Sequence, residues 1–136
     1  MLTSRYLAKL LGSSNKESYR IILALTFTNK ASEEMKNRIL NSLKDFSNFE
    51  EFKDPSPIMI SVKDQLAIPF KEIHIRAKKR LNLLLHNYSF FNVSTLDSFS
   101  HNIIRSFAKE LKISSEIRLI LDSDQLMNES IRRLLD

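Results

Sequence analysis

The chain has 136 residues, 43% of them hydrophobic, and its 21 Lys and Arg against 16 Asp and Glu give a formal net charge of +5. This composition suits one small domain or a piece of a larger one, excludes a disordered tail, and is compatible with an anionic partner without requiring one. The absence of cysteine excludes disulfides and thiolate metal sites. We find neither a signal peptide nor a stretch that approaches the ~18 apolar residues of a membrane span. We therefore expect a cytoplasmic protein without a membrane partner.

The first third of the chain predicts a helix, a strand and a second helix. Apolar residues at helical spacing predict a helix over residues 2–11, which Gly12 ends. The continuous apolar run over residues 20–27 is typical of a strand buried on both faces, as in a parallel sheet. Asn29 is the expected cap of a helix over residues 30–46. The apolar face of that helix comprises Ala31, Met35, Ile39, Leu43 and Phe46.

The rest of the chain continues the alternation of helices and strands. The expected elements are a loop at 54–57, a short helical piece at 62–67, helices at 70–86 and 96–111 with a strand at 91–95 between them, a strand at 117–121 and a helix at 124–135. Strands separated by helices predict a helix-rich α/β fold with a parallel sheet. Two or three strands are few for a free-standing sheet of this kind, which indicates a piece of a larger domain.

Two strand ends carry the polar residues that favour ligand binding. Phe27, Thr28 and Asn29 follow the first strand, at the start of a helix. Thr95 and Ser98 lie at the corresponding place, where the second strand meets its helix. Ligands of open α/β sheets bind at the carboxyl ends of the strands, and helix N-termini attract phosphates. Stacking of a base on an aromatic ring contributes ~1–3 kcal/mol to the binding free energy. The alternative is that Phe27 belongs to the core while the neighbouring polar residues merely cap a helix, and the residues alone favour this alternative without excluding the other.

The segment Thr-Phe-Thr-Asn-Lys-Ala at residues 26–31, followed by Glu-Met at 34–35, resembles motif Ia of UvrD/Rep-type superfamily 1 DNA helicases. Ser32 stands where that family often has alanine. The segment lies under single-stranded DNA in the family. The resemblance therefore implies strand contacts from Phe27, Thr28 and Asn29, with Thr26 in a supporting role.

Residues 91–99 resemble motif Ib of the same family, whose usual form is Thr-Phe/Ile-His-Ser-Phe. The resemblance implies DNA contacts from Thr95 and Ser98. Asp97 replaces the common histidine, and its role stays open between contact with a base edge or sugar and a favourable interaction with the helix dipole. Phe99 lies on the apolar helix face and is expected in the core.

The wide, helical separation of the two motifs resembles the RecB/AddA branch of these helicases. Residues 6–11 look like the end of the helix that follows the P-loop, yet Gly12 is the single glycine, so the chain has no P-loop. The resemblance implies a partial RecA-like P-loop NTPase domain. Residues 1–115 would belong to the helicase core and residues 116–136 would begin the accessory helical subdomain.

The implied function is that of a fragment of an ATP-dependent 3′-5′ DNA helicase or of a helicase–nuclease. Its partners would be single-stranded DNA, the remainder of the motor and a nuclease or helicase partner subunit. ATP and Mg²⁺ belong to the intact parent, whereas this chain alone is expected to hold no cofactor, metal or catalytic residue. The alternative is a non-enzymatic basic module that binds nucleic acid or protein and derives from a truncated helicase gene.

Basic side chains supply further candidates for phosphate contact, although a run of them is more often a solvated helix face. The helix over residues 70–86 is rich in them. The three histidines lack metal-ligand spacing, and no nucleophile motif is present. The candidate phosphate contacts are Lys30, Lys78, Lys79 and Arg105.

Overall fold

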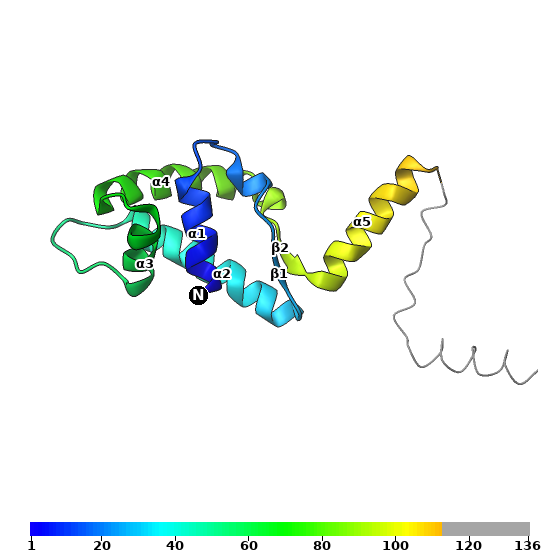
Figure 1. The fold of residues 1–136 in the computed structure, drawn as a ribbon, viewed down its shortest axis with the longest axis horizontal. Coiled ribbons are helices and arrows are strands. Elements are labelled where there is room, and N and C mark those ends of the chain that lie inside the picture. Colours follow the sequence, from blue (N-terminus) through cyan, green and yellow to red (C-terminus); the bar gives the residue numbers. More distant parts are fainter. Residues whose placement is uncertain (113–136) are drawn as a thin grey trace, which may run out of the picture. The chain divides into compact units, whose positions relative to one another are not determined.

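A computed structural model of the protein describes residues 1–112. The chain separates into two units, residues 1–96 and a second unit that begins at Asp97, and each is described by itself (Figure 1). The elements expected over residues 117–121 and 124–135, and the subdomain boundary expected near residue 116, lie outside the described residues. No helix within residues 1–112 is long and apolar enough to cross a membrane.

Helices alternate with two short strands in the first unit, as the apolar periodicity predicts. The elements are α1 (Leu2–Gly12), the 3-10 helix η1 (Ser18–Arg20), β1 (Ala24–Thr26), α2 (Asn29–Ser47), α3 (Pro57–Leu66), α4 (Phe70–His86), the 3-10 helix η2 (Tyr88–Phe90) and β2 (Val93–Thr95). The helix α5 (Leu96–Glu110) follows β2 directly. The bounds of α4 are those expected from the sequence.

The two strands pair in parallel, which confirms the expected arrangement. The register places Ala24 opposite Val93 and Thr26 opposite Thr95, and the amide of Ala24 donates to the carbonyl of Asn92 at 2.9 Å. Parallel neighbours need a long crossover connection, and α2, α3 and α4 supply it. Both strands therefore end at the same edge of the sheet, as the downward course of β1 and β2 in Figure 1 illustrates.

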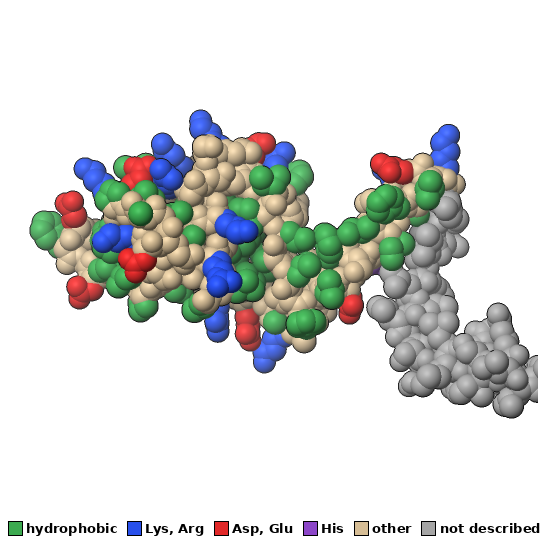
Figure 2. All heavy atoms as spheres, in the orientation of Figure 1, with side chains coloured by type: hydrophobic (Ala, Val, Ile, Leu, Met, Phe, Trp, Pro, Cys, Tyr) green, Lys and Arg blue, Asp and Glu red, His purple; other side chains and the backbone are tan. Residues whose placement is uncertain are grey.

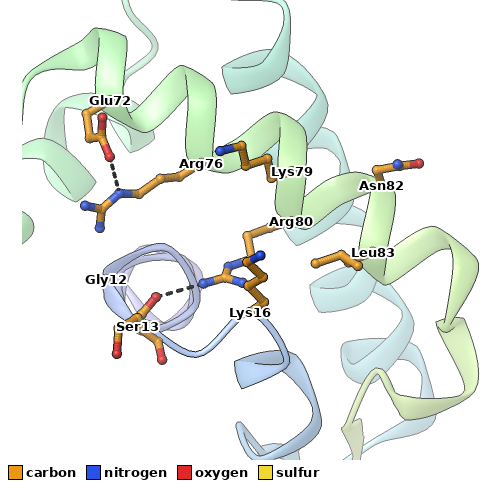
Figure 3. A pocket seen from close by; sticks show the side chains of 10 residues that line it. Gly12, Ser13, Lys16, Glu72, Arg76, Lys79, Arg80, Asn82 and Leu83 are labelled. Atoms are coloured by element: carbon orange, nitrogen blue, oxygen red, sulfur yellow. Dashed lines mark hydrogen bonds and ion pairs between the residues drawn. The ribbon is translucent and has the colours of Figure 1, made fainter.

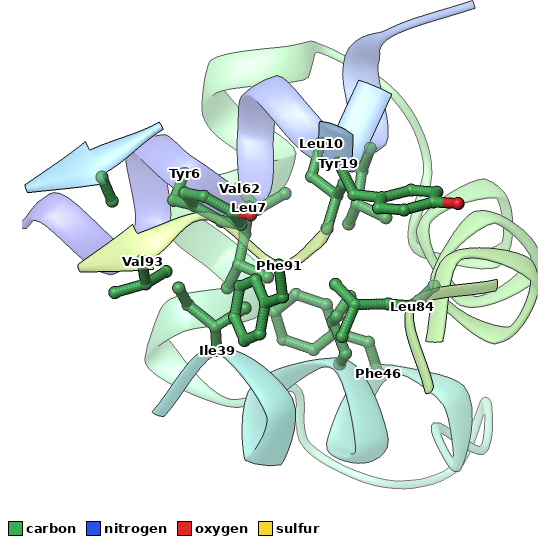
Figure 4. Packing of buried hydrophobic residues seen from close by; sticks show 14 of the residues in the cluster. Tyr6, Leu7, Leu10, Tyr19, Ile39, Phe46, Val62, Leu84, Phe91 and Val93 are labelled. Carbon is green, nitrogen blue, oxygen red and sulfur yellow. The ribbon is translucent and has the colours of Figure 1, made fainter. Parts of the chain in front are cut away.

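The core of the first unit is built around α2, which contacts α1, α3, α4 and both strands. The fully buried side chains come from every α-helix of the unit, and Figure 4 shows them meeting between the helices and the sheet. Burying each such side chain contributes roughly 1.5–3 kcal/mol. Those with no exposed surface include Leu7, Ile39, Phe46, Ile73 and Leu84.

The strand expected over residues 20–27 is shorter and less buried than predicted. Only residues 24–26 form β1, and Ile21 and Leu23 are 76% and 42% exposed. A continuous apolar run predicts burial on both faces only where both faces are covered. Within the described residues β1 has β2 as its single strand neighbour, so part of the run stays at the surface.

Two helix starts also differ from expectation. Thr28, and not Asn29, is the N-cap of α2, because Thr28 has extended backbone angles and its hydroxyl accepts from the amide of Ala31. The helix α3 begins at Pro57, earlier than the expected residue 62. Ser56 caps it by accepting from the amide of Met59 at 3.4 Å, and proline is well suited to a first helical position. Pro57 therefore starts a helix.

Tyr6 is an exception to the good pairing of buried polar groups. The side chain packs edge-on against Phe91, with ring centroids 6.0 Å apart, and is 4% exposed. Its hydroxyl is buried and has no hydrogen-bond partner within residues 1–112. Burial raises the pKa of Tyr6 from 10.0 to about 12, because the phenolate is poorly solvated there.

Removal of this hydroxyl by Tyr6→Phe is expected to raise the free energy of unfolding by about 1 kcal/mol, because a desolvated donor without a partner disappears. The alkaline behaviour should change too. In the native chain the Tyr6 hydroxyl of the unfolded state loses its proton at a lower pH than that of the folded state. The free energy of unfolding therefore falls by about 1.4 kcal/mol per pH unit between pH 10 and pH 12. Denaturant unfolding of both chains between pH 9 and pH 12 measures both effects. A Tyr6→Phe chain that is less stable and shows the same alkaline slope would contradict this account.

Candidate nucleic-acid interface

The candidate site lies at the junction between the end of β1 and the start of α2. Thr28 is extended (φ −124°, ψ 151°), and its hydroxyl accepts from the amide of Ala31 at 3.1 Å. Its carbonyl accepts from the amide of Ser32 at 3.0 Å. The Thr28 hydroxyl is thus engaged as the cap of α2, which leaves other amides of the first helical turn, and the positive end of the helix dipole, at the surface.

A hydroxyl pair fastens the strand end to the helix. The Thr26 hydroxyl donates to the carbonyl of Thr28 at 3.1 Å and also forms a short hydrogen bond with the hydroxyl of Ser32. Because Thr26 has one proton to give, Ser32 is the donor in the second bond. Ser32 is buried, and sequence reasoning noted it only as a departure from alanine. The sequence feature that could have indicated this structural role is a hydroxyl residue about one turn into the helix, where its side chain can reach the end of the strand.

Phe27 lies between β1 and α2 and is 89% exposed. This exposure contradicts the alternative in which Phe27 belongs to the core. Exposure alone does not identify a binding residue, since Phe52 in the loop before α3 is also fully exposed. The position of Phe27 is what distinguishes it: the ring stands at the carboxyl end of a parallel strand, next to a helix N-terminus. Asn29 and Lys30, the first residues of α2, are exposed beside it.

Thr95 lies at the end of β2, directly before α5. The register sets it opposite Thr26, so the two strand ends are adjacent. The side chain is 6% exposed. Direct contact of Thr95 with DNA stays a prediction.

The remaining candidates on α5 belong to the second unit. Asp97 and Ser98 lie in the first turn of this helix and are exposed, as is Arg105 further along. The helix also carries exposed apolar side chains, visible along it in Figure 2. Phe99 is half-buried and not the core residue expected from the sequence. The exposed apolar residues of α5 include Ile103, Ile104 and Phe107.

Two of the predicted phosphate contacts lie on α4, away from the strand ends in sequence. Lys78 and Lys79 are both exposed. The basic face expected on this helix is not uniformly solvated, because Arg80 is 7% exposed and donates to the carbonyl of Ser13 at 2.8 Å. Within residues 1–112 no cluster of His, Asp and Glu side chains has an arrangement that would hold a metal ion.

Comparison with known proteins places the chain among helicase sequences. A model of the UvrD/REP helicase N-terminal domain matches residues 1–135. The chain is 30% identical over 138 residues to ATP-dependent helicase/nuclease subunits of Oceanobacillus iheyensis, Listeria innocua and Listeria welshimeri. Each match covers 100% of this chain and 9% of the relative. No solved structure matches the chain.

Replacement of the capping hydroxyl tests the geometry of the strand–helix junction. Thr28→Ala removes the bond to the amide of Ala31 and is expected to lower the free energy of unfolding by about 1 kcal/mol. Thr28→Ser keeps the hydroxyl and should retain most of the stability. Urea unfolding followed by circular dichroism compares the three chains. Equal stability of the alanine and serine variants would show that the hydroxyl does not cap α2.

Proposed function

The chain belongs to the UvrD/REP helicase N-terminal domain family, and from this membership we propose that it contributes single-stranded DNA contacts to the motor of an ATP-driven 3′-5′ DNA helicase. The helicase/nuclease names of its relatives agree with the RecB/AddA-like branch expected from the motifs. The chain spans 9% of the length of these relatives. We therefore propose that the motor, and a nuclease or partner subunit working with it, lie largely outside this chain.

The observation that carries the proposal is the exposed ring of Phe27 at the junction of β1 and α2. A base stacks on such a ring irrespective of its identity, which suits a protein that moves along DNA of any sequence. The adjacent amides and dipole of α2 favour a phosphate, and exposed Lys30 adds a positive charge. The ring that would stack a base and the groups that would attract a phosphate therefore lie within four consecutive residues.

Some residues of this junction would contact the DNA, and others hold the backbone in position. We assign direct contact to Phe27, Asn29 and Lys30, because their side chains are exposed and, unlike that of Thr28, do not cap the helix. Thr26, Thr28 and Ser32 hold the backbone between strand and helix through their hydroxyls. Support from the second strand comes from Thr95. On α5, Asp97, Ser98 and Arg105 are proposed as further contacts from the second unit.

The ATP and Mg²⁺ that the family implies do not fit the residues of this chain. A P-loop needs several glycines to bring backbone amides around phosphates, and the sequence has only Gly12. A Cβ added at Gly12 would lie 2.7 Å from Cδ2 of Leu66, so this glycine serves the packing of α1 against α3. We propose that the nucleotide is bound by other parts of the parent protein.

Loss of the ring tests the proposed contact. Phe27→Ala is expected to weaken binding of a fluorescent oligo(dT) strand at least about fivefold, the lower limit for one lost base stack of ~1–3 kcal/mol. Fluorescence anisotropy at fixed salt gives the dissociation constants. Phe52→Ala is the matched control, since it removes an equally exposed phenyl ring from a loop outside the junction. Equal binding by the native chain and Phe27→Ala would remove the proposed site.

Turnover by the chain alone tests the assignment of the nucleotide site. We expect no ATP hydrolysis above background in a phosphate-release assay, with or without single-stranded DNA, because no P-loop is present. A parent helicase assayed in parallel is the positive control. Sustained, DNA-stimulated hydrolysis by the purified 136-residue chain would contradict the proposal.

A further inference from the structure

A basic cavity lies at the carboxyl end of α1, between the loop that follows this helix and one side of α4. Its volume is about 570 Å³, within the range of small-ligand pockets. We call it the basic hollow. The charged side chains that line it are Lys16, Glu72, Arg76, Lys79 and Arg80, and Figure 3 shows them arranged around the end of α1.

Positive charge exceeds negative charge in the basic hollow. Its one acid, Glu72, pairs with Arg76 at 2.7 Å. Within residues 1–112 neither Lys16, Lys79 nor Arg80 forms an ion pair. The carboxyl end of α1 contributes a partial negative charge of roughly half an electron, which offsets only a small part of the excess. The cavity therefore has the charge expected of an anion site.

The guanidinium of Arg80 is held in place by a backbone carbonyl. Its Nη2 donates to the carbonyl of Ser13 at 2.8 Å, while Nη1 of Arg76 donates to the carbonyl of Leu11 at 3.0 Å. Burial, together with the like charge of Arg76, lowers the pKa of Arg80 from its usual value. Both arginines also tie α4 to the end of α1, and this structural role accounts for their positions. It does not account for Lys16 and Lys79, which add two more charges to the lining of the same cavity.

The basic hollow is separate from the junction at Phe27. The loop after α1 leads through η1 to the start of β1, whereas Phe27 follows the end of that strand. Figure 1 shows the carboxyl end of α1 and the end of β1 on opposite sides of the first unit. A ligand in the hollow would therefore be distinct from a base on Phe27.

We infer that the basic hollow binds a phosphate group through its two lysines and its two anchored arginines. Guanidinium groups match phosphate oxygens in geometry, and the ammonium groups add charge. The phosphate belongs either to a DNA strand or to a free phosphate compound. The inference does not depend on the helicase assignment, because it rests on the cavity and its charges alone.

The test uses the full 136-residue chain with the double variant Lys16→Gln, Lys79→Gln. Neither lysine forms an ion pair within the described residues, so the fold should survive, and circular dichroism checks this. The matched control is Lys53→Gln, Lys71→Gln, which removes the same charge from exposed sites outside the hollow. Isothermal titration with pyrophosphate is expected to show at least about tenfold weaker binding for the first variant and little change for the control.

A second titration with oligo(dT) identifies the source of the phosphate. Loss of affinity for both pyrophosphate and the oligonucleotide in the hollow variant supports a DNA strand, and loss for pyrophosphate alone supports a free phosphate compound. Unchanged pyrophosphate binding, or an equal loss in the control, overturns the inference. Phe27→Ala should leave pyrophosphate binding intact, so failure of the junction and failure of the hollow are distinguishable.

Discussion

The parallel pairing of β1 with β2 is the constraint on which the rest of the first unit depends. Parallel neighbours end at the same edge, and the register of Ala24 with Val93 aligns those ends to the residue. The polar residues that follow β1 therefore begin a helix beside the end of β2. A one-residue slip would reverse the faces of the paired side chains and would bring the buried Thr95 to the opposite face.

The crossover that makes this pairing possible also builds the opposite end of the unit. The helix α2 starts at the strand ends and buries its apolar face against α4. That packing presents Arg76 and Arg80 to the carbonyls at the end of α1. The exposed ring of Phe27 and the basic hollow thus depend on the same core, although the carboxyl end of α1 and the end of β1 lie on opposite sides of the unit (Figure 1).

The sequence predicted most of the helices and the parallel order, because apolar residues recur at helical spacing in α1, α2 and α4. It overestimated the first strand, since the apolar run cannot reveal whether anything covers Ile21 or Leu23. Thr28 and Asn29 are both good capping residues, and only the backbone angles distinguish them. The burial of Arg80 arises from a loop far away in the chain, so the basic pattern of α4 alone predicted an exposed face.

The central claim is that single-stranded DNA stacks a base on Phe27. The most direct measurement is photo-crosslinking of the chain to an oligonucleotide that carries 5-iodouracil, with the attached peptide identified by mass spectrometry. The account predicts that the main crosslink falls on Phe27 and is lost in the presence of excess unlabelled strand. A main crosslink at Phe52 or at Tyr88, with none at the junction of β1 and α2, would contradict it.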